Sequence, residues 1–181
     1  MSLKKNVFVI IGSAGSNSAN EVLINNFANL TKDCFNLSIF NKLKSLPPFD
    51  PELSIHHPPK AIIAFRNHIE KADGVIICTP EYIFSIPSGL KNALEWCVST
   101  TIFTGKPVGL ITASAHGQKG HDELQLIMQT LMAQFDPETT LLIQGIKGKL
   151  DEKGSITDEH VKTALKYFSE AFKLQLSRSE K

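Results

Sequence analysis

The sequence predicts an α/β fold in which a doubly wound sheet of five parallel strands lies between two layers of helices. Short apolar runs rich in β-branched residues recur along the chain, and each has the length of a strand buried on both faces. Segments with apolar residues three or four positions apart separate these runs, as in amphipathic helices. Because strands and helices alternate, we expect a three-layer sandwich around a parallel sheet.

The strand candidates are residues 7–11, 36–40, 74–78, 108–112 and 140–143. Five helical patterns alternate with them, and Thr157-Asp158-Glu159 gives the last one a capped, acidic first turn. The segment 43–59 is rich in proline and has no regular pattern, so we expect a binding or interface loop there. The apolar positions of the helical patterns are Leu23, Phe27 and Leu30; Ile62, Phe65 or Arg66, and Ile69; Leu90, Ala93, Leu94 and Cys97; Leu124, Ile127, Met128 and Leu131; and Val161, Leu165, Phe168, Phe172 and Leu176.

The composition is that of a soluble globular protein with no bias toward nucleic acid or membrane. The 181 residues fit one domain over residues 1–181, with 42% hydrophobic and 20% charged residues and a formal net charge of +1. The charge balance argues against a nucleic-acid partner, and no apolar stretch approaches the roughly 20 residues of a membrane span. The three cysteines form no CxxC pair, which favours reduced core thiols in a cytoplasmic protein.

A loop of small polar residues follows the first strand and precedes a helix. It reads Gly12-Ser13-Ala14-Gly15-Ser16-Asn17-Ser18-Ala19-Asn20. Free N–H groups at the amino end of a helix, with the helix dipole behind them, favour a phosphate. The loop is neither a Walker A motif nor GxGxxG. Because it has so few basic residues, it suits a monophosphate held largely by neutral donors. The alternative is a Gly/Ser turn that only caps the helix.

A second loop, Thr79-Pro80-Glu81-Tyr82, directly follows the buried run 74–78. Pro80 cannot extend a strand ladder, and Pro87 opens the next helix, so the loop between them is rigid. The loop projects from the carboxyl end of a strand, which is where open α/β sheets bind ligands. Its aromatic ring suits a flat, electron-accepting cofactor.

Together the two loops resemble those of the NADPH-dependent FMN reductase family, which has the flavodoxin-like fold. That family shows Gly-Ser-x-Arg-x-x-Ser-x-Asn in the first loop. It shows Thr-Pro-Glu-Tyr-Asn in the second, followed by Ser-x-Pro-x-x-Leu-Lys-Asn-Ala and an acidic-Trp pair. The resemblance spans about residues 5 to 145. The matching residues are Gly12, Ser13, Ser18 and Asn20, then Thr79-Pro80-Glu81-Tyr82, Ser85, Pro87, Leu90-Lys91-Asn92-Ala93 and Glu95-Trp96.

The resemblance implies the strand order 2-1-3-4-5 and an enzyme that holds FMN and takes a hydride from NADPH or NADH. Its electrons would pass to a small-molecule acceptor such as a quinone, an azo compound, a free flavin or a metal oxyanion. Because the cofactor carries the chemistry, no catalytic side chain is expected. The expected cofactor-binding residues are Ser13, Ser18, Asn20, Pro80, Glu81, Tyr82, Ile83 through its backbone N–H, and Ser114 after the fourth strand.

Two positions depart from the family pattern. Gly15 stands where the family has arginine, so a charge contact to the phosphate is missing. Ile83 stands where the family has asparagine, which makes that wall more apolar. Two alternatives therefore stay open, a flavin-binding electron carrier that never meets nicotinamide and a degenerate member that has lost flavin. The nearly neutral charge argues against the carrier, because such carriers tend to be acidic for steering.

Two further features concern assembly and metals. Trp96 lies off the apolar face of its helical pattern, and an outward tryptophan often marks an interface. The resemblance implies dimers that use this helix, so we expect a homodimer, or a dimer of dimers, that buries Trp96. His116 and His121 have no third ligand at a sensible spacing, so no metal site is expected.

Overall fold

The computed structural model describes residues 4–178 and confirms the predicted α/β architecture. Five parallel strands form one sheet in the order β2-β1-β3-β4-β5, which is the order expected of a flavodoxin-like fold. Each strand begins and ends within two residues of its predicted bounds. The strands are β1 (Lys5–Ile11), β2 (Phe35–Phe40), β3 (Gly74–Thr79), β4 (Val108–Ser114) and β5 (Thr140–Gln144).

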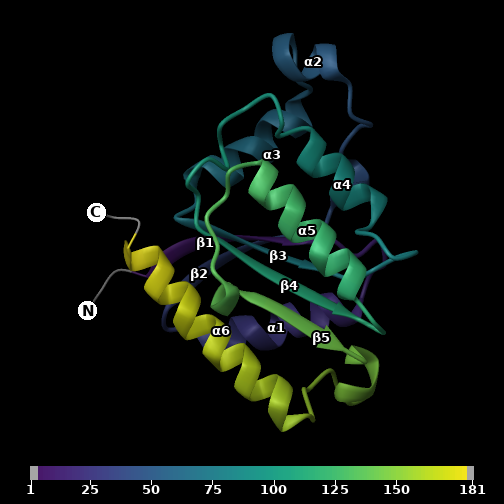
Figure 1. Cartoon of the computed structure of the whole chain (residues 1–181), viewed down its shortest axis with the longest axis vertical. Helices are drawn as coiled ribbons and strands as arrows, with labels where there is room; N and C mark the ends of the chain where they lie inside the picture. The colour runs from purple at the N-terminus through teal and green to yellow at the C-terminus, as the bar shows by residue number, and fades with distance from the viewer. Residues whose placement is uncertain (1–3, 179–181) are drawn as a thin grey trace.

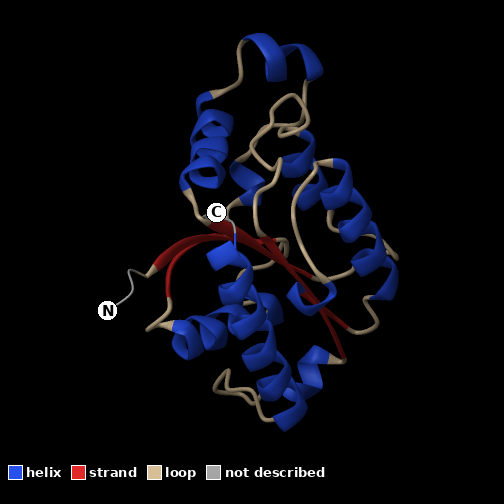
Figure 2. Cartoon of the chain, turned by 60° about the vertical axis from the view of Figure 1, so that its left-hand side comes forward, coloured by secondary structure: helices blue, strands red, loops and turns tan. Residues whose placement is uncertain are grey.

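Helices cover both faces of the sheet, so the molecule has three layers (Figures 1 and 2). The helices α1 (Ala19–Thr31) and α6 (Glu159–Arg178) cover one face, and their apolar residues form one buried cluster with the sheet. The helices α3 (Lys60–Lys71), α4 (Ser88–Glu95) and α5 (Gln118–Thr130) cover the other face and build a second cluster. The strands β1, β3 and β4 are almost wholly buried between these layers.

The predicted apolar positions of the helices mostly lie in these two clusters. All five positions of α6 are buried, and the carboxylate of Asp158 accepts a hydrogen bond from the Val161 N–H at 2.9 Å, as expected of a helix cap. Leu30 is the exception, because it is exposed on α1 while Ile24 packs into the core in its place.

The segment 43–59 is more regular than the sequence analysis predicted. It contains the short 3₁₀-helix η1 (Leu43–Ser45) and the helix α2 (Pro51–His56), which stands off from the sheet at the top of Figure 1. The Asp50 side chain caps α2 by accepting from the backbone N–H groups of Glu52 and Leu53. The sequence Asp50-Pro51-Glu52 has the cap, proline and acidic first turn of a helix start, so the signal was present.

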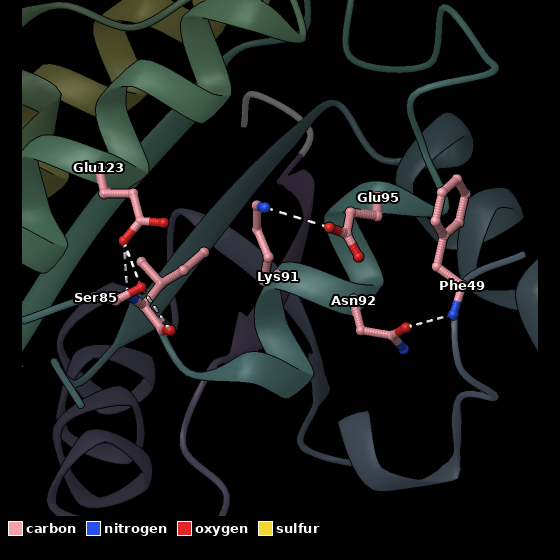
Figure 3. Close-up of polar contacts among 7 residues, drawn as sticks. Phe49, Ser85, Lys91, Asn92, Glu95 and Glu123 are labelled. Carbon is pink, nitrogen blue, oxygen red and sulfur yellow. Dashed lines mark hydrogen bonds and ion pairs between the residues drawn. The ribbon is translucent and has the colours of Figure 1, made fainter. Parts of the chain in front are cut away.

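Trp96 does not point outward, contrary to the sequence prediction. Its side chain is 0% exposed, and Nε1 donates to the Pro47 carbonyl at 2.9 Å. The ring of Phe49 packs edge-on against it with centroids 5.4 Å apart. Asn92 fixes this covering segment, because its Nδ2 donates to Pro47 O at 3.0 Å. Its Oδ1 also accepts from Phe49 N at 2.7 Å, as Figure 3 shows. Residues 47–49, which have no regular sequence pattern, thus cover Trp96. From helical spacing alone this side of α4 was expected to be exposed.

The burial of Trp96 predicts a folding defect, with no change in assembly, when it is replaced. Trp96→Phe removes the donor to Pro47 and leaves a small void, so the free energy of unfolding should fall by about 1–3 kcal/mol in urea titrations. Trp96→Glu places a carboxylate among apolar groups and should prevent stable folding. A Trp96→Glu protein with wild-type stability would contradict this account of the residue.

Candidate functional site

A pocket of about 610 Å³ opens at the carboxyl ends of the strands. Its walls come from the loop 13–20 after β1, the loop after β3, residues 113–115 at the end of β4, and residues 145–148 after β5. Open α/β sheets bind their ligands at this edge. Six of the eight residues predicted to bind a cofactor line the pocket, namely Ser13, Ser18, Asn20, Pro80, Tyr82 and Ser114. Glu81 and Ile83 do not.

The loop after β1 carries backbone donors that the rest of the protein leaves free. The N–H groups of Ala14, Gly15 and Ser16 have no hydrogen-bond partner within residues 4–178. Ser18 caps α1, because its Oγ accepts from Glu21 N at 3.2 Å. No atom lies within 4 Å of the place that a Cβ on Gly15 would take. The loop therefore has the donors and the room to cradle an anion at the start of a helix.

Asn20 holds this cradle against the sheet. Its side chain is buried, with Nδ2 donating to the Ala113 carbonyl at 3.1 Å and Oδ1 facing the Cys78 thiol at 3.3 Å. Both ends of the amide are thus engaged with the ends of β3 and β4. The main effect of Asn20 is to fix where α1 begins.

The loop after β3 ends in a tight turn with two residues in the left-handed region. Tyr82 and Ser85 exchange backbone hydrogen bonds of 2.8 and 3.1 Å, and Ile83 and Phe84 between them have φ values of 51° and 58°. These are the features of a type I′ turn, which usually holds asparagine or glycine. A left-handed conformation costs a β-branched residue roughly 1–2 kcal/mol. The two side chains are 95% and 73% exposed, so Ile83 extends into solvent and forms no wall of the pocket.

Glu81 ties the first half of this loop to α5. Its Oε1 accepts from Gly117 N at 3.2 Å and its Oε2 from Gly120 N at 2.9 Å. These N–H groups belong to the amino end of α5, where the helix dipole favours a carboxylate. The Ser114 hydroxyl also faces the Glu81 carbonyl at 3.4 Å. The Glu81 carboxylate therefore positions the loop.

Glu123, which was not among the residues predicted from the sequence, holds the second half of the loop. Its Oε2 accepts from the Ser85 hydroxyl at 2.6 Å and from Ile86 N at 3.1 Å (Figure 3). Nothing in the local pattern of α5 marks this residue, because its partners lie 38 and 37 positions away in the chain. The strained turn is thus held by a carboxylate on each side.

Tyr82 links the two loops of the pocket. Its hydroxyl lies 3.4 Å from the Ser13 Oγ, and its ring lines the pocket while remaining partly exposed. The aromatic ring and the loop after β1 therefore line the same pocket.

The two histidines near this edge have different settings. His121 is buried, its Nδ1 lies 2.9 Å from Thr112 Oγ1, and burial lowers its pKa although Asp122 opposes the shift. His116 is exposed. Within residues 4–178 there is no group of three or more His, Cys, Asp or Glu side chains that could hold a metal ion.

A fourth wall, formed by residues 145–148 after β5, also escaped the sequence analysis. Gly145 has a φ of 65°, and its N–H donates to the Ala115 carbonyl at 3.1 Å. The glycine directly after a strand was the one signal of a turn here. This turn brings Lys147 to the pocket.

Comparison with known proteins identifies the family. Residues 5–147 match the model of the NADPH-dependent FMN reductases. The chain belongs to this family. It is 30% identical over 179 residues to a 2-hydroxy-1,4-benzoquinone reductase from a Burkholderia species, covering 95% of each chain. It is also 30% identical over 139 residues to a quinone reductase from Escherichia coli K12, covering 75% of this chain and 73% of that one.

A solved structure supports the same assignment. The flavoenzyme NAD(P)H:(acceptor) oxidoreductase FerB from Paracoccus denitrificans has a TM-score of 0.82 with this chain. The two are 25% identical, and the match covers 97% of this chain and 98% of that one. The predicted flavodoxin-like fold and the predicted family are therefore confirmed.

Because Glu81 and Glu123 hold the loop after β3 through hydrogen bonds, we expect that loop to become more mobile when the Glu123 side chain is truncated. Glu123→Ala leaves Ser85 and Ile86 without their acceptor, so amide hydrogen exchange in residues 81–86 should accelerate. The free energy of unfolding should fall by about 1–3 kcal/mol. Asp122→Ala is the control, because this neighbouring carboxylate bonds a glutamine of its own helix. Equal exchange rates in the two variants would argue against the tie.

Proposed function

We propose that this chain is an NAD(P)H-dependent FMN oxidoreductase that reduces quinone or flavin acceptors, with FMN in the pocket at the carboxyl edge of the sheet. The observation that carries the proposal is the joining of a neutral anion cradle and a rigid aromatic loop in one pocket. Membership of the FMN reductase family supports it, as do the names of the quinone reductases that the chain resembles.

The residues present fit FMN. The free N–H groups of residues 14–16 and the hydroxyls of Ser13 and Ser18 suit one terminal phosphate. Pro80 and Tyr82 form an apolar and aromatic wall for a flavin ring, and Ser114 suits its polar pyrimidine edge. The volume of the pocket is in the range of small-molecule sites. Bound FMN would accept a hydride from the nicotinamide and pass the electrons to the acceptor.

The side chains of this chain act by binding and orienting. Glu81 and Glu123 hold the aromatic loop in place, Asn20 sets the position of the cradle, and the Ile83 N–H is the predicted backbone contact to the flavin. Both carboxylates beside the pocket accept hydrogen bonds from the protein, so the role assigned to them is to position the loop.

The cradle predicts that a negative charge at Ser18 removes FMN without harming the fold. Ser18→Asp keeps a helix cap for Glu21 N but places a carboxylate beside the phosphate, so the affinity for FMN should fall by at least roughly tenfold. Fluorescence titration measures the affinity. Ser18→Asn is the matched control, since it caps the helix without charge and should keep most of the FMN affinity.

The same titration with FAD tests the choice of flavin. One terminal phosphate fits the cradle, so wild-type protein should bind FMN more tightly than FAD. Equal or tighter FAD binding, or an Asp variant that binds FMN like the Asn variant, would rule out a phosphate at this loop.

A homodimer is also proposed. Trp96 is buried and does not support it, but the exposed side chains of Ile83 and Phe84 do. Monomers usually keep exposed apolar patches small, yet these two side chains extend into water beside the pocket. Light scattering should show a wild-type dimer, and Phe84→Glu should shift it toward monomers. Tyr167→Glu is the control, because Tyr167 on α6 is also 73% exposed and should leave the dimer intact. A wild-type monomer, or equal effects of the two variants, would contradict this interface.

The cytoplasmic location is likewise proposed. No helix within residues 4–178 is long and apolar enough to cross a membrane. Cys78 and Cys97 are buried, and burial raises the pKa of the Cys97 thiol to about 12 although Arg66 opposes the shift. Such thiols are unreactive core residues, which suits a reducing compartment.

A further inference from the structure

A phosphate bound at the loop after β1 would lack a cation from that loop. Gly15 occupies the position of the family arginine, and the other side chains of the loop are neutral. Glu21 adds a negative charge nearby, because its carboxylate accepts from Asn17 N at 3.0 Å and from Asn41 Nδ2 at 2.9 Å. A phosphate here would therefore meet neutral donors and an adjacent carboxylate.

Lys147 lies on another wall of the same pocket, which Gly15 and Ser16 also line. Among the described residues that line this pocket, it alone is charged at neutral pH. Its side chain is exposed and makes no hydrogen bond or ion pair within residues 4–178. The ammonium group is therefore free to meet an anion.

The turn that carries Lys147 is anchored on both sides. It belongs to the 3₁₀-helix η3 (Ile146–Lys149), which follows β5 at the carboxyl edge of the sheet (Figure 1). Ile146 is buried in the apolar cluster under α1 and α6. The second lysine of the turn, Lys149, lies 4.0 Å from the Asp158 carboxylate. The two lysines thus have different surroundings, one lining the pocket and the other paired with Asp158, directly before α6.

We propose that Lys147 pairs with the phosphate of FMN. From across the pocket it supplies the positive charge that the family's arginine carries at the position of Gly15. This inference rests on the proposed function, because FMN provides the phosphate. A lysine suits the task, since its ammonium is a point charge on a flexible stem and needs no fixed geometry. The 2′-phosphate of NADPH has the same chemistry, so the test separates the two sources.

The test compares FMN with riboflavin, which lacks the phosphate. Dissociation constants are measured by flavin fluorescence for wild type, Lys147→Gln and the control Lys149→Gln. Lys147→Gln should weaken FMN roughly three- to tenfold, leave riboflavin unchanged, and reduce the salt dependence of FMN binding. Lys149→Gln should change none of these.

A compensating variant sharpens the test. The Gly15 backbone is not in the left-handed region and a Cβ there would meet no other atom within 4 Å, so a side chain can be placed at this position without backbone strain. Adding Gly15→Arg to Lys147→Gln should restore the affinity for FMN and leave that for riboflavin unchanged.

Three results would overturn the inference. Equal losses of FMN and riboflavin would mean that Lys147 shapes the pocket and does not pair with the phosphate. Unchanged FMN affinity with a higher KM for NADPH, but not for NADH, would assign Lys147 to the 2′-phosphate. Unchanged FMN affinity alone would remove it from phosphate binding altogether. A wild-type protein that binds no FMN is a different outcome, because it would overturn the proposed function as well.

Discussion

The loop after β3 depends on two carboxylates that hold it against α5. Glu81 and Glu123 together accept four hydrogen bonds on either side of the turn at Ile83 and Phe84. Hydrogen bonds to charged groups contribute roughly 1.5–3 kcal/mol each, whereas two left-handed residues cost roughly 2–4 kcal/mol together. The bonds therefore outweigh the strain, and the loop stays where it can form one wall of the pocket.

The same edge of the sheet explains why segments far apart in the chain build one site. Parallel strands bring their carboxyl ends together, so the loops after β1, β3, β4 and β5 meet. Asn20 bonds across from α1 to β4, and Tyr82 reaches Ser13. In this arrangement the protein contributes shape, donors and a fixed aromatic ring, and it leaves the redox chemistry to the flavin.

The sequence predicts the sheet well, because buried parallel strands form apolar runs that need no partner to be recognised. It also locates both pocket loops, since each follows such a run. The prediction that Trp96 is exposed was wrong because residues 47–49 cover it. That segment has no regular sequence pattern, and Asn92 fixes it through tertiary hydrogen bonds. Glu123 and Lys147 were missed for a similar reason. Their roles depend on which distant segments the fold brings beside them, and local spacing carries no information about that.

In the proposed function, FMN held in this pocket takes electrons from a reduced nicotinamide. The most direct test mixes the FMN-loaded protein with NADH or NADPH in a stopped-flow instrument without oxygen and follows the yellow flavin absorbance. The absorbance should be lost with at least one of the two nicotinamides and should return when a benzoquinone is added. Protein-bound FMN that stays oxidised with both nicotinamides would contradict the proposed function.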